Sequence, residues 1–367
     1  MQALTILHTE ASLGWGGQEI RIFTEMQAMR QRGHRLLLAA QPESQLAAKA
    51  TEAGFEVFPF SEKRLLFPWQ LLRLLLCLRR VRPDVVNTHS SKDGWLAGLA
   101  ARLAGVPCLI RSKHIDVDYP RKFSSRIAYG LLPHHTLTTS EKIRQKICQE
   151  LSISTARVSN LPTGIDPAPY LDEIPPTLRL ELKVTPETPL IGMISVIRSW
   201  KGHRFFLEAA LELAAKLPQS HFVIVGDGPG HASLVETVLS LGLRHRIHCL
   251  GHRHDVPKIL KALNVLVLPS TAHEGVPQII LQAQLARCPV VATSVGGIPE
   301  VVEDGITGRL VPPSNGEALA RAIFNTLKLP EQTQAMVEQA HQRALRENTL
   351  DVMCQRTEEI YQRILVC

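Results

Sequence analysis

The feature that most constrains the fold is a regular alternation of short apolar segments with longer segments of helix length. The apolar segments lie at 4–9, 35–40, 57–60, 84–89, 108–112, 135–140 and 157–162, and then at 189–195, 221–226, 246–251, 265–270, 289–294 and 307–311. Segments that are apolar on both faces and separated by helix-length crossovers are typical of parallel β-sheets covered on both sides.

The alternation restarts after a proline-rich stretch at 166–189, and 367 residues are enough for two domains. We therefore predict an α/β protein with a Rossmann-like N-terminal domain over 1–166, a linker over 167–189 and a second such domain over 190–349. An amphipathic helix at about 350–367 is expected to join the first domain. Two facing domains of this kind form a cleft at the carboxyl ends of their strands, where open α/β sheets bind ligands.

The charge of the chain is unevenly distributed. Residues 1–170 hold 22 Lys and Arg against 14 Asp and Glu, whereas the remaining residues hold 19 against 20, so the whole net charge of +7 comes from the first half. This favours an anionic ligand or surface for the N-terminal domain. There is no zinc finger, RNP motif or basic-aromatic repeat, which argues against nucleic acid as the partner.

Cysteine spacing and hydropathy indicate the compartment. The 7 cysteines form no CxxC pair and no metal-ligand spacing, so we expect reduced thiols in a reducing environment. The first residues have no basic, apolar leader, and the most apolar run (LLRLLLCLRR) is too short and too basic to span a bilayer. A cytoplasmic protein is therefore expected.

Two glycine-rich loops follow predicted strands. In ASLGWGGQE, Gly16 and Gly17 come just before a predicted helix, where free backbone N–H groups bind phosphate. In GDGPG, Gly226 occupies a similar place. Glu19 and His231 stand where a dinucleotide fingerprint needs its third glycine, so a dinucleotide cofactor is disfavoured. The alternative for either loop is a tight turn without a ligand.

Charged residues follow two strands of the second half. Arg198 and Lys201 in SVIRSWKGH are suited to neutralise a diphosphate, and the alternative is a solvated basic loop. In HEGVP, Glu274 precedes a turn with Pro277, which suits the first turn of a helix. The alternative for Glu274 is a helix cap, worth about 1 kcal/mol.

These motifs, taken in order, resemble the retaining GT-B glycosyltransferases of family 4. SWKGH, GDGP, HEGVP and VGGIPEVVEDGITG resemble the C-terminal domain of that family, and GWGGQE and TGID resemble its N-terminal domain. The resemblance covers nearly the whole chain. It implies a GT-B fold and a transferase that needs no metal. It further implies transfer of a sugar from a nucleotide-diphosphate sugar to a hydroxyl of a glycan or lipid-linked acceptor.

The resemblance also implies roles for individual residues. Arg198 and Lys201 would hold the donor diphosphate, and Glu274 would contact the transferred sugar. Backbone groups would approach the rest of the donor at these positions: Gly16, Gly17, Gly226, Gly275, Val276 and Pro277. His114, after the fifth strand, resembles the histidine that faces the sugar near the reacting carbon, and His89 is a second candidate at the end of the preceding strand.

Two positions depart from the family pattern. Gln282 replaces the second glutamate of the E-x7-E motif, which normally holds the nucleotide ribose, and loss of one charged hydrogen bond costs roughly 1.5–3 kcal/mol. Val196 stands where many members carry arginine, so Arg198 would act from a shifted position. These departures leave open a catalytically weak nucleotide-sugar-binding homologue. A nucleotide-sugar 2-epimerase shares the fold but needs no acceptor.

The acceptor side falls on the basic N-terminal domain. The segment 61–84 mixes leucines, Phe67 and Trp69 with several arginines, and Arg121 and Lys122 add positive charge. Such a face would rest on anionic lipid at the inner side of the plasma membrane, as in lipopolysaccharide or other envelope synthesis. The alternative is an ordinary sheet-covering helix. Asp116 and Asp118 form a DxD sequence away from the expected diphosphate site, and we interpret it as chance.

Overall fold

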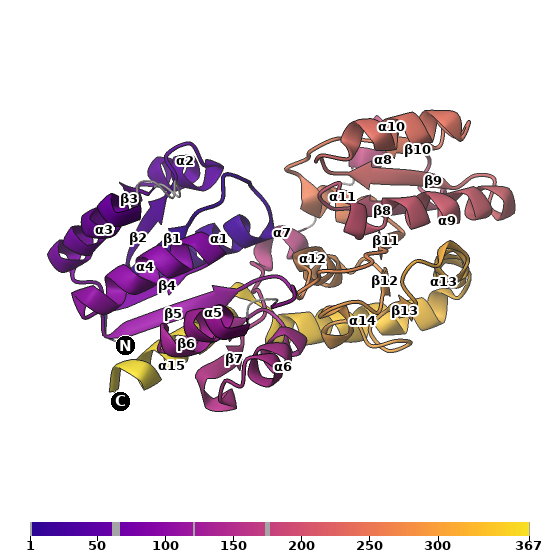
Figure 1. Cartoon of the computed structure of the whole chain (residues 1–367). Coiled ribbons are helices and arrows are strands. Elements are labelled where there is room, and N and C mark those ends of the chain that lie inside the picture. The colour runs from indigo at the N-terminus through magenta and orange to yellow at the C-terminus, as the bar shows by residue number, and fades with distance from the viewer. Residues whose placement is uncertain (1, 61–66, 120–121, 173–176, 367) are drawn as a thin grey trace. The chain divides into compact units, whose positions relative to one another are not determined.

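The computed structural model describes residues 2–60, 67–119, 122–172 and 177–366. It divides into two compact units (Figure 1). Unit 1 comprises residues 1–164 and 350–367, and unit 2 comprises residues 165–349. Among the residues described, no helix has both the length and the apolar character needed to cross a membrane.

Unit 1 is built on a seven-stranded parallel sheet with the order β3-β2-β1-β4-β5-β6-β7. Its strands are β1 Thr5–Glu10, β2 Arg35–Ala40, β3 Glu56–Pro59, β4 Val85–Thr88, β5 Cys108–Lys113, β6 His135–Thr138 and β7 Val158–Asn160. Its helices are α1 Gly17–Gln31, α2 Gln45–Glu52, α3 Phe67–Val81, α4 Ser91–Ala104, α5 Lys122–Arg126, the π-helix η2 Ile127–Leu131, α6 Glu141–Glu150, the short 3-10 helix η3 Thr155–Arg157 and α15 Leu350–Val366.

The helices of unit 1 cover both faces of the sheet. Buried residues of α1, α2 and α15 pack on one face, and those of α3 and α4 pack on the other. Helix α15 is fixed to unit 1 by Glu358, whose carboxylate accepts hydrogen bonds from the Arg32 guanidinium at 2.8 Å and lies 2.9 Å from His34 Nε2. Tyr361 from the same helix is fully buried in the core.

Unit 2 repeats this architecture with six strands in the order β10-β9-β8-β11-β12-β13. The strands are β8 Leu190–Ile194, β9 His221–Val225, β10 Ile247–Cys249, β11 Val265–Leu268, β12 Val290–Thr293 and β13 Arg309–Val311. The helices are α7 Ala168–Leu171, α8 Thr177–Glu181, α9 His203–Lys216, α10 His231–Ser240, α11 Val256–Ala262, α12 Gln278–Leu285, α13 Gly316–Lys328 and α14 Pro330–Glu347, with 3-10 turns η4 Ser199–Lys201 and η5 Ile298–Glu300.

The predicted fold class is confirmed, because both sheets are parallel and wound on both faces. In each sheet the strand order reverses beside the first strand, β1 or β8, and this switch point is where such sheets bind ligands. The segment 167–189, predicted as a linker, carries α7 and α8. Tyr170 and Leu178 from these helices are buried in the core of unit 2.

Candidate active site

Two loops of unit 2 are held together by a glycine that no other residue can replace without strain. Gly202 ends the β8–α9 loop with φ of +78°, and a Cβ at this position would lie 1.9 Å from the carbonyl oxygen of Pro269, at the end of β11. The N–H of Thr271 donates to the Trp200 carbonyl at 2.7 Å. The loop after β8 and the loop after β11 are therefore in direct contact.

This contact brings two of the predicted site residues together. Lys201 Nζ lies 2.5 Å from Glu274 Oε1, and the Ser270 hydroxyl donates to the same oxygen at 2.6 Å. Glu274 is only 5% exposed. The capping alternative for Glu274 is not what the structure shows, because α12 begins after Pro277 without any side-chain cap. The pair joins the cation expected on the diphosphate to the acid expected on the sugar.

The backbone after Glu274 offers hydrogen-bond donors. Gly275, Val276 and Pro277 are all buried. Within the described ranges, the N–H groups of Gly275 and Val276 donate to no protein acceptor. Because a buried N–H without an acceptor is costly, oxygen atoms of a ligand are suited to this position. The Val276 side chain instead packs in the core.

A third loop, which follows β12, closes on the same acid. The Gly297 N–H donates to the Glu274 carbonyl at 3.2 Å. Gly296 has φ of +59°, and its missing side chain leaves room for that carbonyl, which would lie 2.1 Å from a Cβ. The sequence signal for this loop was its Gly-Gly pair, and the structure shows that the pair positions the main chain of Glu274.

The other predicted donor residues of unit 2 are placed as follows. Arg198 is exposed, with its guanidinium 5.2 Å from the centre of the Trp200 ring. Val196 is also exposed. Gln282 lies half-buried in the second turn of α12. The tight-turn alternative has support at Gly226, because a Cβ there would lie 1.9 Å from the carbonyl oxygen of a neighbouring loop.

His203 is a residue at this site that the sequence analysis did not single out. It is buried at the start of α9, with Nε2 3.4 Å from the Ser195 hydroxyl. Burial and the neighbouring Lys201 lower its pKa to about 4, so the ring is neutral at pH 7. Its position directly after the Lys-Gly pair was the available signal.

Unit 1 places three histidines in a row across its switch point. His8 lies on β1, His89 follows β4 and His114 follows β5. His8 Nδ1 is 2.9 Å from His89 Nε2, and His89 Nδ1 is 3.0 Å from His114 Nε2. The rings are stacked, with both pairs of centroids 5.2 Å apart. The sequence predicted His114 and His89 but missed His8, whose signal was a histidine inside an apolar strand.

The three rings are neutral at pH 7, and their hydrogen-bond direction can be inferred. Burial lowers the pKa of His8 to about 3 and lowers the pKa values of His89 and His114 well below their usual range. His8 Nε2 is buried without a partner. A bare acceptor there costs less than an orphaned N–H, so His8 donates to His89 and His89 donates to His114. This leaves Nδ1–H of the half-buried His114 as the donor at the end of the row.

Two buried acids lie near the ends of β1 and β4. Asp93 Oδ2 accepts hydrogen bonds from the Thr9 hydroxyl at 2.6 Å and from the backbone N–H of His89 at 2.9 Å. Glu10, at the end of β1, accepts from the Gln18 side chain. Burial, with the nearby Asp93, raises the pKa of Glu10 to about 7. The sequence analysis missed both acids, although each lies within a few residues of a strand end.

The glycine pair of unit 1 lies at the N-terminus of α1. The Gly16 N–H donates to Glu19 Oε2 at 2.9 Å, and Gly17 begins the helix. Gly16 has φ of −143°, and a Cβ there would make only ordinary contacts. The fold therefore does not require glycine at position 16, which leaves close approach of a ligand as a reason for it.

The remaining predicted residues of unit 1 are placed as follows. Lys122 is exposed on α5, and Arg121 lies outside the described residues. Asp116 and Asp118 both accept hydrogen bonds from Lys146 Nζ at 2.9 Å. Across the part of the chain that the structure describes, there is no group of three His, Cys, Asp or Glu side chains arranged to hold a metal ion.

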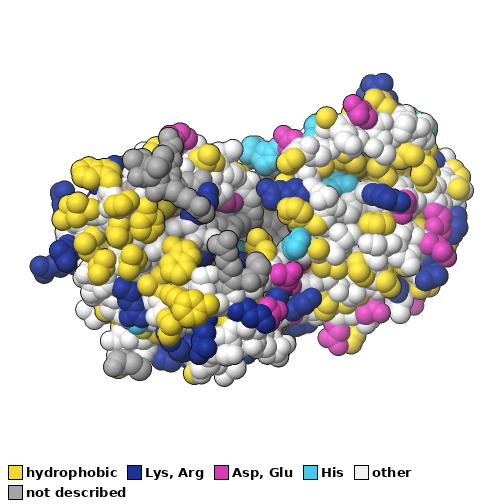
Figure 2. Space-filling model, in the orientation of Figure 1, with side chains coloured by type: hydrophobic (Ala, Val, Ile, Leu, Met, Phe, Trp, Pro, Cys, Tyr) yellow, Lys and Arg dark blue, Asp and Glu magenta, His cyan; other side chains and the backbone are white. Residues whose placement is uncertain are grey.

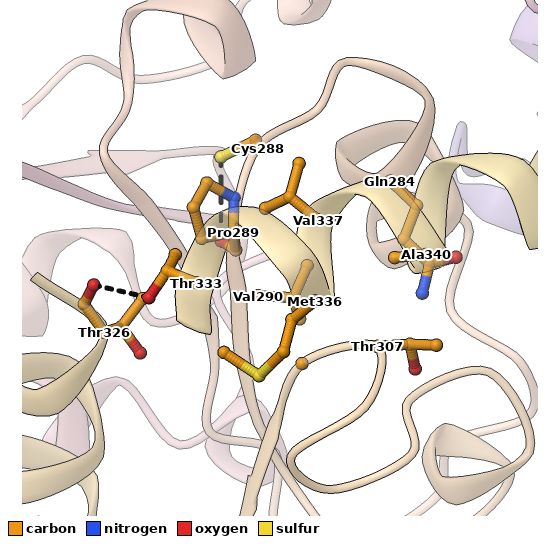
Figure 3. Close-up of a pocket in the computed structure, with 11 residues that line it drawn as sticks. Gln284, Cys288, Pro289, Val290, Thr307, Thr326, Thr333, Met336, Val337 and Ala340 are labelled. Atoms are coloured by element: carbon orange, nitrogen blue, oxygen red, sulfur yellow. Dashed lines mark hydrogen bonds between the residues drawn. The ribbon is translucent and has the colours of Figure 1, made fainter. Parts of the chain in front are cut away.

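A small cavity in unit 2 is not a ligand site. It lies beside α14, and its volume of about 10 Å³ has room for at most one water molecule (Figure 3). Its lining is mostly apolar, with Val337 and Met336 among the side chains drawn, and the Thr333 hydroxyl is bonded to the Thr326 carbonyl at 2.8 Å. We interpret it as a packing defect of the core.

The fold is that of a two-domain α/β protein with a candidate site at the carboxyl ends of its strands, and comparison with known proteins shows its family. A family model described as glycosyltransferase family 4 matches residues 15–169, and one described as glycosyl transferases group 1 matches residues 188–328. The UDP-Gal:alpha-D-GlcNAc-diphosphoundecaprenol alpha-1,3-galactosyltransferase of Escherichia coli is 31% identical over 69% of this chain and 68% of its own length. The chain belongs to the family 4, or group 1, glycosyltransferases.

Other relatives and solved structures agree with this assignment. The alpha-D-kanosaminyltransferase of Streptomyces kanamyceticus is 28% identical over 74% of this chain and 75% of its own. A glycosyltransferase from Rickettsia africae superposes with a TM-score of 0.90 at 21% identity, covering 100% of this chain and 99% of that one. HepE of Anabaena, solved with UDP-glucose, superposes with a TM-score of 0.86 at 23% identity, covering 98% and 100%. These structures support the GT-B fold.

Proposed function

We propose that this glycosyltransferase moves a sugar, with retention of configuration, from a UDP-sugar to a hydroxyl of a glycan or lipid-linked acceptor. The observation that carries the proposal is the buried Glu274, bonded to Lys201 and followed by two N–H groups that have no acceptor among the described residues. A solved relative in fold holds UDP-glucose, and a sequence relative uses UDP-galactose. Both favour uracil as the base of the donor.

The charge changes of the reaction fit this arrangement. The anomeric C–O bond of the donor breaks, and negative charge develops on the departing diphosphate. Lys201, Arg198 and the free N–H groups are suited to stabilise it without a metal ion. Glu274 accepts hydrogen bonds from sugar hydroxyls and orients the ring. The acceptor hydroxyl attacks the same face, where the departing phosphate oxygen is the nearest base for its proton.

We assign the acceptor to unit 1. The Nδ1–H of His114 would donate to a hydroxyl or ring substituent of the transferred sugar, and His89 would fix its tautomer. Gly16 and Gly17 would let the backbone of α1 approach the donor diphosphate. The Escherichia coli relative acts on a sugar linked through diphosphate to undecaprenol. A lipid-linked acceptor of cell-envelope polysaccharide or lipopolysaccharide synthesis is the class that we propose.

An exposed surface of unit 1 that is both apolar and basic fits such an acceptor. Helix α3 exposes Trp69 and Leu76 beside Arg73 and Arg79. Figure 2 shows hydrophobic side chains gathered with Lys and Arg on the face of unit 1 where α3 and α4 lie. Indole rings and basic side chains favour the interface of an anionic membrane. We propose peripheral binding at the inner face of the plasma membrane.

The first experiment is a thermal-shift panel of UDP-, GDP- and ADP-sugars, in EDTA, on wild type and Glu274→Ala. A donor at 100 times its dissociation constant should stabilise the protein by about 2.7 kcal/mol. We expect a UDP-sugar to shift wild type strongly. The Glu274→Ala variant should respond to that UDP-sugar only as it responds to UDP, because it lacks the sugar contact. Glu300→Ala, in the next loop, is the matched control and should behave as wild type.

The outcomes separate the alternatives. Turnover that requires an added acceptor supports a transferase, whereas conversion of the nucleotide sugar alone would indicate an epimerase. Absence of any donor-induced shift would contradict the proposal and favour a homologue that has lost its site through Gln282 and Val196. An equal response of wild type and Glu274→Ala to the UDP-sugar would remove Glu274 from the sugar site.

A further inference from the structure

Unit 1 contains a pocket of about 160 Å³ that the donor chemistry does not use. It is formed where the start of α4 and the end of β5 meet α5 and η2. The residues that carry the argument are Trp95 from α4, Arg111 and Lys113 from β5, and Tyr119 and Tyr129. The hydroxyl residues Ser91, Ser124 and Ser125 and the acid Asp118 also line it.

The pocket contains two buried cations. Arg111 is 4% exposed and Lys113 is 8% exposed. Arg111 donates weakly to the Thr88 hydroxyl at 3.4 Å, and its Nε is buried without a partner. Lys113 Nζ lies 5.9 Å and 5.8 Å from the ring centres of Tyr119 and Tyr129. Neither cation forms an ion pair with any carboxylate in the described ranges.

Two uncompensated charges at this depth are costly. A buried ion loses several kcal/mol of hydration unless an opposite charge and hydrogen bonds replace the lost water. The two tyrosine rings offer cation–π contact, worth about 1–2 kcal/mol, and both cations interact with the Tyr129 hydroxyl, whose pKa they lower, but no carboxylate in the described ranges pairs with them. Asp118 does not neutralise the pocket, because its side chain is 94% exposed and is bonded to Lys146 at 2.9 Å. The pocket is therefore electropositive.

The neighbouring helix is shaped to admit the guanidinium group. Gly94 lies inside α4, where glycine costs about 1 kcal/mol relative to alanine. A Cβ on Gly94 would lie 1.1 Å from Arg111 Nη1. The helix therefore gives up stability so that Arg111 can enter the pocket. The space beside Gly94 does not depend on charge, and together with the two buried cations it indicates that the fold forms a binding site for an anion.

We propose that Arg111 and Lys113 bind a phosphoryl group carried by the acceptor substrate. A guanidinium fork binds two phosphate oxygens, and the ammonium adds a point charge. Trp95, at 39% exposure on the rim, offers a flat surface for a sugar ring beside that phosphoryl group. The inference rests on the proposed transferase function and narrows it to a phosphorylated acceptor.

The test measures binding by isothermal titration to the full-length protein, with glucose 1-phosphate, inorganic phosphate and glucose as probes. We expect glucose 1-phosphate to bind more tightly than inorganic phosphate, and glucose to show no binding. Lys113→Met should weaken the binding of glucose 1-phosphate and of inorganic phosphate at least 10-fold. Lys49→Met is the matched control, because Lys49 also lies over an aromatic ring, 5.1 Å from the centre of Trp15, but outside the pocket.

A stability readout separates anion binding from a structural role. Without phosphate, Lys113→Met should unfold at the same temperature as wild type or a higher one, because an uncompensated buried charge is removed. A lower midpoint, with no effect of phosphate on wild type, would show that the lysine only supports the two tyrosines. Gly94→Ala gives a second variant, since its methyl group displaces Arg111 and should also abolish phosphate binding.

The remaining outcomes distinguish this inference from the function on which it rests. UDP-glucose binding should be equal in wild type and Lys113→Met. If UDP-glucose binds and neither phosphate does, the phosphoryl site is wrong and the transferase proposal stands. If no nucleotide sugar binds, the transferase proposal itself fails. If inorganic phosphate binds as tightly as glucose 1-phosphate, the pocket holds free phosphate and the assignment to the acceptor is overturned.

Discussion

The two units share a topology, but different kinds of groups lie at the carboxyl ends of the strands in their two sheets. In unit 2 the candidate site consists mainly of glycines, main-chain groups and one ion pair, Lys201 with Glu274. In unit 1 the corresponding edge buries polar side chains, among them the row His8–His89–His114 and the acids Glu10 and Asp93. One edge is shaped by the path of the backbone, and the other by side-chain chemistry.

This difference follows from what each edge is proposed to bind. Every donor of this class carries a nucleotide diphosphate, and backbone N–H groups with a lysine are sufficient to hold it. Acceptors differ from one enzyme to another, so side chains must define them. A buried polar side chain also reduces stability when its protonation changes, so unit 1 should be more sensitive to pH than unit 2.

The largest effect is expected from His8→Leu. Because burial lowers the pKa of His8 to about 3, the stability that its neutral form allows is present above pH 6.5 and is lost as the pH falls toward 3. At pH 7 the variant should be less stable by about 1–2 kcal/mol, since His89 loses a partner. As the pH falls from 6.5 to 4.5, the free energy of unfolding of the variant should rise relative to that of wild type by about 2.7 kcal/mol.

The change in stability is measured by urea unfolding at each pH, monitored through hydrogen exchange of the amides of β1 and β4. The exchange of β8 and β9 in unit 2 is the internal control and should not differ between the two proteins at any pH. Parallel stability curves for wild type and variant would show that His8 titrates normally, and the contrast between the two edges would then lose its electrostatic basis.

A backbone substitution in unit 2 should produce the next largest effect. Gly202→Ala and Gly242→Ala both force alanine into a positive φ, +78° and +68°. Only the former also clashes, with the Pro269 carbonyl, whereas a Cβ at Gly242 meets nothing within 4 Å. Gly202→Ala should therefore be less stable than its matched control by about 1–3 kcal/mol.

Donor binding makes this comparison specific to the site. Gly202→Ala should weaken the binding of UDP-glucose, because it separates the loops that pair Lys201 with Glu274. Gly242→Ala should leave the affinity for UDP-glucose unchanged. Calorimetric titration of both variants measures it. Equal affinities would mean that the contact between the two loops does not shape the donor site.

The smallest effect is expected from Gln282→Glu. A carboxylate accepts hydrogen bonds from both ribose hydroxyls, whereas the carboxamide accepts from one side only. UDP should bind up to about 10-fold more tightly to the variant, which corresponds to about 1.4 kcal/mol. Gln278→Glu, one turn earlier on α12, is the control. Weaker UDP binding by Gln282→Glu would show that the glutamine suits its ligand better than an acid does.

The sequence predicted the fold well because both sheets are buried on two faces. The continuous apolar strands and the helix-length spacers left few alternatives, and the strands are found close to their predicted positions. Lys201 and Glu274 were also predictable, since each follows a strand end in a loop with glycine. Their pairing was not, because it depends on the packing of Gly202 against Pro269, which no local pattern records.

The polar edge of unit 1 was harder to predict. His8 and Glu10 lie within a strand, and there a lone polar residue is usually explained by exposure to solvent. Both are fully buried, and the histidine partner of His8, His89, lies 81 residues away in the chain. Arg111 and Lys113 were missed for the same reason, because alternating residues of β5 gave no sign of the pocket that they enter.

The return of α15 to unit 1 makes unit 2 an insertion within unit 1. A ribosome completes every strand of unit 1 before it begins unit 2, yet the core that Tyr361 fills stays open until residues 350–366 emerge. Unit 2 is then free to fold first, while one sheet face of unit 1, already packed by α1 and α2, still lacks α15. The part of the enzyme that is made first is therefore finished last, and its newly made sheet is the surface that most needs protection during synthesis.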